Sequence, residues 1–251
     1  EDTKVELGPT LRKLVTAARF NPSLPYLSFL CINFDAPVVQ EAASWFLDAV
    51  FLNYNSSYLE RMLEQMLDEG DSREVTRFLR AVDVRIDGFR VERAPEWRGQ
   101  RVFVRHEVGG KSYELRLSEE SAGTQKLMGL AAYLMTALER GGTVVVDELA
   151  KLHPKLLRYV ILLFKDPEVN KSGAQLIFSS QDVSTMRNDV FRRDEIWFAA
   201  RGEGEASQLW SLADIHEANG NLVSKNAAFD KQYLSGRYGA DPYLTRIEEW
   251  D

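Results

Sequence analysis

The sequence is poor in the residues that build covalent cross-links and metal cages. It holds one cysteine, Cys31, among 251 residues, so no disulfide can form within the chain. Its three histidines, His106, His153 and His216, are far apart, and none is near Cys31. The ligand spacing of a zinc site is therefore absent.

Long hydrophobic runs are lacking too. No apolar run approaches the roughly 20 residues that a membrane-spanning helix needs. The first residues, Glu1 to Lys4, carry no signal-peptide pattern. We therefore expect a cytoplasmic protein with no membrane partner.

Basic residues are fewer than acidic ones. The 31 lysines and arginines are outnumbered by 38 aspartates and glutamates, which gives a net charge of −7. An acidic chain is a poor candidate for a dedicated nucleic-acid binder, although the total says nothing of a local basic patch. The rest of the composition, 45% hydrophobic and 27% charged, is typical of a globular protein with a core.

Residues 1–122 are expected to form a helical and antiparallel-sheet lobe. Between residues 9 and 80, apolar residues recur at helical spacing, for example at Trp45, Phe46, Ala49 and Val50. From 82 to 86 they alternate with charged residues, which predicts a strand; Gly88 suggests a bulge, after which the strand continues through Phe89 and Val91. Residues 102–108 and 111–117 predict a hairpin around Gly109-Gly110.

Residues 123–251 show an α/β pattern. A helix follows Gly123 and ends at Gly141-Gly142; one of its faces carries Leu127, Leu130, Leu134 and Leu138. The wholly apolar run 143–146 predicts a parallel strand buried on both faces, and 174–178 predicts a second buried strand. Pro154 suits the first turn of a helix over 156–164. Residues 195–198 and 208–210 predict a hairpin.

Two carboxylates, Asp147 and Glu148, emerge at the end of the strand at 143–146. Ligands of such sheets bind beyond the carboxyl ends of the strands. One carboxylate can hold the shell of a Mg²⁺ ion, and the other can orient or deprotonate the attacking water in phosphate transfer. In the alternative interpretation, Asp147 caps a turn and Glu148 faces solvent. The segment alone does not decide between them.

Two further segments could contact a phosphate. Ser121 can cap the helix that follows it, and Gly123 lets a phosphate approach the free amides at the helix start. Ser179, Ser180 and Gln181 come directly after the strand at 174–178. The alternatives are an ordinary helix cap and a strand that ends in a turn.

The 251 residues contain no phosphate-binding loop of the G-x-x-x-x-G-K-[ST] kind. Gly110-Lys111-Ser112 looks like the end of one, but Arg105 occupies the position of the required glycine. The segment also lies in a predicted hairpin instead of a strand-to-helix turn. The nest of backbone amides and the lysine that hold a nucleotide's phosphates are therefore missing from this sequence.

The order of the three motifs resembles the C-terminal half of an ATP-binding-cassette head. From about Leu79 to Tyr243 the chain is similar to a family of bacterial ATPases often associated with anti-phage defence and related to the heads of chromosome-maintenance and DNA-repair ATPases. The similar stretches are residues 120–126, 146–149, 152–154, 174–178, 192–198 and 233–242. The strings RRDEIWF and YLSGRYGADP are the most unusual of them.

The resemblance implies a role for each candidate residue. Ser121 and Gly123 would belong to the signature that contacts the γ-phosphate held by the other protomer. Thr124 and Lys126 at the same helix start would join them in binding nucleotide. Asp147 would support Mg²⁺, and Glu148 would be the catalytic base. Gln181 stands where the family usually has a phosphate-sensing histidine, and Ala150 where it usually has an aspartate that couples the two sites.

The resemblance implies an ATPase that binds ATP and Mg²⁺ and dimerises, or forms a higher homo-oligomer, when nucleotide is bound. It also implies control of an effector protein, such as a nuclease or a toxin. The phosphate loop is expected before Glu1 or on another chain. Two alternatives stay open: a degenerate scaffold head that binds a partner without hydrolysis, and a DNA-repair type of DNA-binding ATPase.

Overall fold

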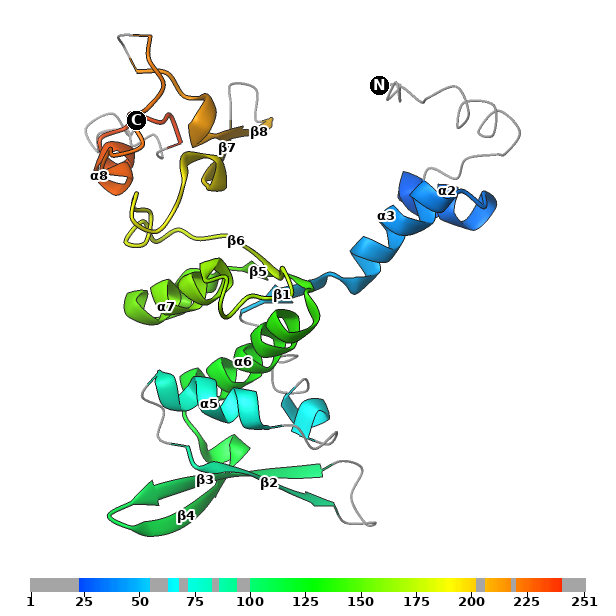
Figure 1. Cartoon of the computed structure of the whole chain (residues 1–251), viewed down its shortest axis with the longest axis vertical. Coiled ribbons are helices and arrows are strands. Elements are labelled where there is room, and N and C mark those ends of the chain that lie inside the picture. Colours follow the sequence, from blue (N-terminus) through cyan, green and yellow to red (C-terminus); the bar gives the residue numbers. More distant parts are fainter. Residues whose placement is uncertain are drawn as a thin grey trace, which may run out of the picture.

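The computed structural model describes residues 23–54, 63–67, 72–82, 86–93, 100–201, 206–217 and 220–240. Its helices include α2 (Tyr26–Asn33), α3 (Pro37–Asp48), α5 (Arg73–Ala81), α6 (Ala122–Arg140), α7 (Pro154–Lys165) and α8 (Phe229–Leu234). Its strands are β1 (Val50–Asn53), β2 (Gly88–Arg93), β3 (Gln100–Val108), β4 (Lys111–Arg116), β5 (Thr143–Asp147), β6 (Gln175–Phe178), β7 (Trp197–Arg201) and β8 (Ser207–Ser211). Figure 1 shows their arrangement.

A parallel sheet with the order β1-β5-β6 lies at the centre of the protein. Val144 of β5 pairs with Val50 on one side and with Leu176 on the other. Strand β1 shows that the helical interpretation of residues 49–53 is wrong, since α3 ends at Asp48. The β-branched and aromatic residues of β1 fit a strand, and pairing with β5 outweighs the local helical spacing.

Only one face of this sheet is covered by the described residues. Helices α6 and α7 lie under it (Figure 1), and Val144 and Val146 are fully buried in the core that they share. On the other face a row of paired residues is open to solvent: Phe51 is 61% exposed, Val145 is half-buried and Ile177 is 50% exposed. The prediction of strands buried on both faces is therefore wrong for this part of the chain.

Helix α6 agrees with its predicted periodicity, because Leu127, Leu130, Leu134 and Leu138 are all buried. It ends at Gly141 in the left-handed conformation, with φ 81°. A β-carbon at Gly141 would lie 2.3 Å from the carbonyl oxygen of Ser172, so the turn into β5 needs glycine. Helix α7 begins with Pro154 as predicted.

The antiparallel sheet β2-β3-β4 lies beyond α5, at the opposite end of the molecule from α8 (Figure 1). The predicted hairpin turns at Gly109 and Gly110, which both have positive φ. Strand β2 begins at Gly88, and Val82 lies in a turn after α5. The predicted strand is therefore wrong at Val82 and Ile86, and residues 83–85 lie outside the described part. Its continuation through Phe89 and Val91 is confirmed, because both belong to β2.

One apolar cluster connects the inner faces of both sheets with α5, α6 and α7. It contains residues from Leu52 to Val190, on both sides of residue 122. The division into a lobe over 1–122 and a lobe over 123–251 stays a prediction. The part of the predicted helical region before residue 23 lies outside the described residues.

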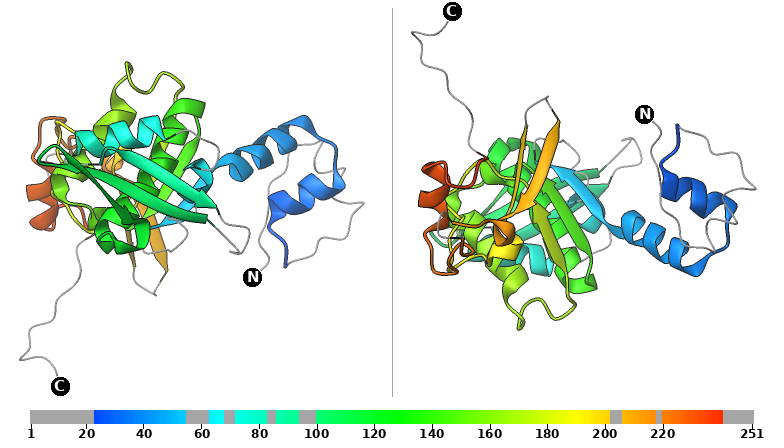
Figure 2. Two further views of the ribbon diagram at one scale, coloured as in Figure 1. Left: turned by 90° about the horizontal axis from the view of Figure 1, so that it is seen from below. Right: turned by 90° about the horizontal axis from the view of Figure 1, so that it is seen from above.

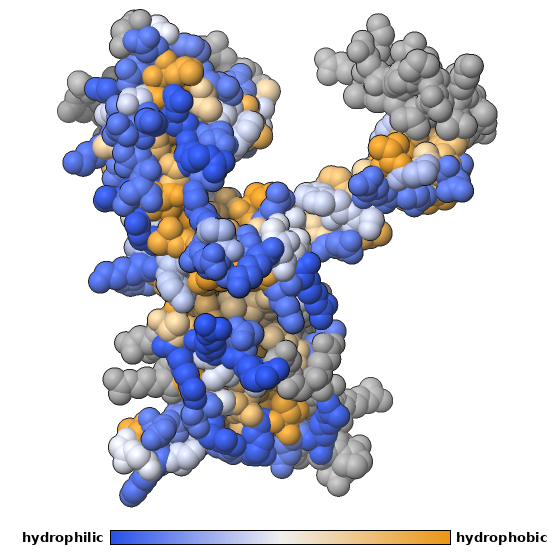
Figure 3. Space-filling model, in the orientation of Figure 1, coloured by the Kyte–Doolittle hydropathy of each residue, from blue (hydrophilic) through white to orange (hydrophobic). Residues whose placement is uncertain are grey.

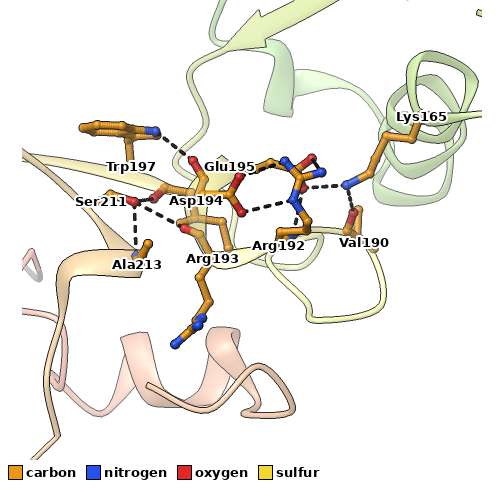
Figure 4. Close-up of polar contacts among 10 residues, drawn as sticks. Lys165, Val190, Arg192, Arg193, Asp194, Glu195, Trp197, Ser211 and Ala213 are labelled. Atoms are coloured by element: carbon orange, nitrogen blue, oxygen red, sulfur yellow. Dashed lines mark hydrogen bonds and ion pairs between the residues drawn. The ribbon is translucent and has the colours of Figure 1, made fainter. Parts of the chain in front are cut away.

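The hairpin of β7 and β8 forms a second apolar cluster with α8, in which Phe198 stacks on Tyr233. The two predicted strands are confirmed; residues 202–205 between them lie outside the described part. A polar cluster joins this lobe to α7 (Figure 4). There Glu195 accepts hydrogen bonds from the Lys165 ammonium at 2.6 Å and from the Arg192 backbone N–H at 2.7 Å. The string RRDEIWF therefore fixes the start of β7 against α7.

Helices α2 and α3 form an arm that stands away from the sheets in every view (Figures 1 and 2). They pack on each other through Phe29, Leu30 and Val39. Apolar residues are also visible on the surface of the arm (Figure 3). Leu47 of α3 is 86% exposed. Within the described residues, no helix is long and apolar enough to cross a membrane.

Candidate functional site

Three polar side chains meet where the parallel strands end. Asp147 ends β5, Asn53 ends the neighbouring β1, and Ser179 follows β6 on the other side. The Ser179 hydroxyl donates to Asp147 Oδ1 at 2.6 Å, and the Asn53 amide donates to Asp147 Oδ2 at 3.2 Å. Both carboxylate oxygens are thus held, and the carboxylate stays exposed at the sheet edge. Asp147 connects strand ends instead of capping a turn.

Glu148 lies next to this network in an unusual backbone conformation. Its φ of 60° and ψ of 37° are left-handed, and no other non-glycine residue of the described part has a positive φ. Its N–H donates to the Ser179 hydroxyl at 2.9 Å, so Ser179 contacts both predicted acids. The Glu148 carboxylate lies 2.7 Å from the Lys151 ammonium, and its side chain is 38% exposed. Glu148 therefore faces partly into solvent with a cation beside it.

The start of α6 has the geometry that the sequence predicted. The Ser121 hydroxyl accepts the backbone N–H of Thr124 at 3.1 Å and lies 2.7 Å from the Thr124 hydroxyl. Gly123 is exposed, and a β-carbon there would meet only the Ser121 oxygen, at 4.0 Å. The backbone at this point is therefore open to a ligand of some size, and the helix dipole favours an anion there.

Lys126 connects the helix start to the strand ends. Its ammonium lies 5.7 Å from the ring centre of Tyr54, the residue after β1. The Tyr54 N–H in turn donates to the backbone carbonyl of Asp147 at 3.1 Å. Burial raises the pKa of Tyr54, so the phenol stays neutral beneath the cation. The predicted nucleotide contact of Lys126 stays a prediction.

Gln181 lies in a bend, three residues beyond the end of β6, and is exposed. Its neighbours Ser180, Asp182 and Ser184 form a turn with hydrogen bonds of their own. Gln181 makes no side-chain hydrogen bond to the described residues. The structure thus leaves this residue near the strand end without fixing its side chain on Asp147 or Glu148.

The donors at the strand ends fit Mg²⁺. The ion prefers oxygen ligands, keeps several waters and needs only one or two protein carboxylates together with substrate phosphates. Asp147 supplies a carboxylate, and Ser179 and Asn53 supply a hydroxyl and an amide beside it. No group of three or more His, Cys, Asp or Glu side chains able to hold a metal occurs in the described part.

The sequence reasoning missed three members of the site, Asn53, Tyr54 and Lys151. Asn53 and Tyr54 could have been found only by recognising β1 as a strand parallel to β5. Lys151 follows Glu148 by three residues, a spacing typical of a helical ion pair, but a 3-10 turn at Leu149–Lys151 carries it here. His153 caps α7 through its Nδ1, which accepts the Lys155 N–H.

A family model described as "AAA domain, putative AbiEii toxin, Type IV TA system" matches residues 20–187. A similar solved structure is the Smc head domain of Pyrococcus furiosus, with an extended coiled coil and bound to the C-terminal domain of ScpA. It is 18% identical, with a TM-score of 0.38, over 59% of this chain and 35% of that one.

The chain thus spans about a third of the length of that Smc chain. No curated protein matches. The family match, in contrast, covers more than half of the chain and includes β1, β5, β6 and all three predicted motifs up to Gln181. The protein therefore belongs to this family of AAA domains, which is described as containing a putative AbiEii toxin of a type IV toxin–antitoxin system.

Proposed function

We propose that this protein is part of an ATP-gated dimerising ATPase that controls an effector. One observation carries the proposal: the Asp147 carboxylate is held from both sides at the carboxyl edge of a parallel sheet, with Glu148 next to it. Carboxylates at strand ends serve phosphate transfer in this class of fold. An α/β core of this kind and the match to an AAA family support the same chemistry.

The residues would divide the work by position. Asp147 would hold the Mg²⁺ that, when bound, neutralises charge on the phosphates. Glu148 would orient or deprotonate the attacking water, once its carboxylate leaves Lys151. Ser121 and Gly123, at the exposed start of α6, would contact the γ-phosphate of a nucleotide held by a second protomer. Thr124 and Lys126 would complete that contact.

The phosphate cradle would come from a strand–loop–helix unit outside the sequence motifs found here. Two features of the sheet support this. The outer edge of β6 pairs with no strand of the described part, and the row of Phe51, half-buried Val145 and Ile177 is partly open to solvent. Parallel sheets normally carry helices on both faces. One added unit would pair with β6, cover the row and bring backbone amides to the strand ends beside Ser179.

The effector is proposed as a toxin or a nuclease. The family description names a putative toxin of a toxin–antitoxin system, and that association supports control of a harmful activity by nucleotide state. The anti-phage setting, the homodimer and the effector rest on resemblance. The net charge of −7 disfavours the DNA-repair alternative.

A non-hydrolysing scaffold is the second candidate. Gln181 in place of a histidine, Ala150 in place of an aspartate and the ion pair of Glu148 with Lys151 favour it. A nucleotide-binding assay on the full-length protein separates the two candidates. A scaffold gives the same partner binding with and without ATP.

The experiment that tests hydrolysis replaces Glu148 by glutamine in the full-length protein. Removing one catalytic carboxylate typically lowers the rate by roughly 10²–10⁴-fold, while ATP binding is kept. An ATP-bound dimer should therefore accumulate, measured by light scattering with Mg·ATP. Glu139→Gln, at an exposed position near the end of α6, is the matched control and should behave as wild type. Normal turnover in Glu148→Gln would refute the catalytic role.

A further inference from the structure

A partly buried acid–base pair joins the antiparallel sheet to the start of α6. His106 Nε2 lies 2.5 Å from Glu120 Oε1, and the two side chains are only 19% and 9% exposed. On β3, His106 continues the inward row of Val102 and Val104, which are 4% and 0% exposed. The packing of β3 therefore sets the position of the histidine independently of its contact with Glu120.

Glu120 immediately precedes Ser121, the cap of α6. Its backbone carbonyl accepts a hydrogen bond from the Gln125 side chain at 2.7 Å. The Glu120 carboxylate is thus held by the sheet, and its backbone is held by α6. Since little of this carboxylate reaches solvent, removal of its partner would leave a shielded charge with less compensation. The segment would then have to move to hydrate it.

The neighbouring turn does not need this pair. Glu119 accepts the backbone N–H of Arg116 at 2.8 Å and so caps the 3-10 turn Leu117–Glu119 by itself. The contact of Glu120 with His106 instead fixes where α6 begins relative to β3. It acts on the two residues, Ser121 and Gly123, that the proposed function assigns to phosphate contact.

We propose that His106 is a positioning residue: through Glu120 it holds the start of α6 in the orientation in which Ser121 and Gly123 meet the phosphate of a second protomer. The inference rests on the proposed function, and it extends that function from the strand ends to the antiparallel sheet. A shift of β3 relative to α6, as when a partner binds the sheet, would be transmitted to the nucleotide contact.

The test uses the full-length protein in three variants. His106→Ala removes the contact, and His106→Gln retains a donor that can reach the carboxylate. Glu107→Ala is the matched control, because Glu107 is the next residue of β3 and is exposed. Two quantities are measured: hydrogen exchange of residues 119–126 without nucleotide, and the ATP-dependent dimer fraction together with ATP affinity.

We expect His106→Ala to speed exchange at residues 119–126 by at least about tenfold, the size of one lost hydrogen bond to a charged group. The dimer fraction should fall while the ATP affinity of the monomer is unchanged. His106→Gln should restore both, and Glu107→Ala should change neither. Unchanged exchange in His106→Ala overturns the inference whatever the ATPase does. Faster exchange with normal dimerisation overturns it as well.

Failure of the proposed function is a separate result. If wild-type protein forms no dimer with Mg·ATP, then the trans contact is wrong. The exchange data alone then decide whether His106 fixes the start of α6. Should His106→Ala not fold, Glu120→Gln takes its place as the disrupting variant, because it keeps the shape of the side chain and removes the carboxylate. His106→Gln remains the variant that retains a donor.

Discussion

The backbone conformation of Glu148 predicts that glycine at this position gives a more stable protein than alanine, the reverse of the usual order. With φ 60° and ψ 37°, the residue is left-handed, a conformation that costs about 1–2 kcal/mol for a residue with a β-carbon and nothing for glycine. Ser179 and Lys151 hold it there: the Glu148 N–H donates to the Ser179 hydroxyl, and the Glu148 carbonyl accepts the Lys151 N–H. Glu148→Gly should remove this strain without changing either hydrogen bond.

Comparison with Glu148→Ala isolates the backbone contribution. Both substitutions lose the ion pair between Glu148 and Lys151, whose side chains are 38% and 49% exposed respectively. The loss costs about 0–1 kcal/mol in each variant and cancels when the two variants are compared. Alanine keeps the strain and glycine relieves it. We therefore expect Glu148→Gly to be more stable than Glu148→Ala by about 1 kcal/mol, since glycine also gains freedom in the unfolded chain.

Urea unfolding measures this difference as a shift in midpoint at constant slope. The control is the same pair of substitutions at Glu139, inside α6, where glycine should be less stable than alanine by roughly 1 kcal/mol. The reasoning is refuted if glycine is no more stable than alanine at position 148, or if both positions give the same sign. In the full-length protein, the proposed function predicts that neither variant at 148 hydrolyses ATP at the wild-type rate.

Two further predictions concern Gln181 and Tyr238. In the full-length protein, Gln181→Ala should lower ATP turnover by about 10- to 150-fold, the loss of one hydrogen bond to a charged oxygen, with ATP affinity little changed. Gln181→His should restore turnover and add a pH dependence near pH 6–7. If the steady-state rate of Gln181→Ala lies within about twofold of wild type, the residue is structural. Burial raises the pKa of Tyr238 to about 12, whereas an unfolded tyrosine titrates near 10, so the unfolding free energy should fall between about pH 10 and 12 as the unfolded chain loses protons first. Urea unfolding of Tyr238→Phe over that range should show a smaller fall; part of it remains, because burial also raises the pKa of Tyr54.

Local signals predicted much of the fold. The leucine spacing of α6, the glycine pair in the β3–β4 turn and Pro154 at the start of α7 all appear where the sequence places them. Each depends on residues a few positions apart. Ser121 capped its helix as predicted for the same reason: a cap involves only the next three residues.

Two of the errors involve partners far along the chain. β1 is four residues long, follows directly on α3, and its Asn53 meets Asp147 94 positions later. The apolar residues at 45–50 recur at helical spacing, and no residue near β1 in the sequence indicates that it pairs with β5. The predicted burial of β6 failed for a related reason. An apolar sequence such as Leu176-Ile177-Phe178 indicates a strand suited to burial on both faces. The described residues cover only one face of the sheet, so Ile177 remains exposed.

The geometry favours a functional strand end over the turn-cap alternative. A strand that merely ended at Asp147 would best place glycine or asparagine in the left-handed position that follows, because those residues tolerate it. The chain instead has a glutamate there, keeps its N–H on Ser179, and uses the same Ser179 hydroxyl to hold Asp147. Strain of this kind persists where the surroundings over-determine it, which is typical of active sites. If the strain serves chemistry, glycine at 148 should give a more stable protein than alanine, and neither variant should be a working ATPase.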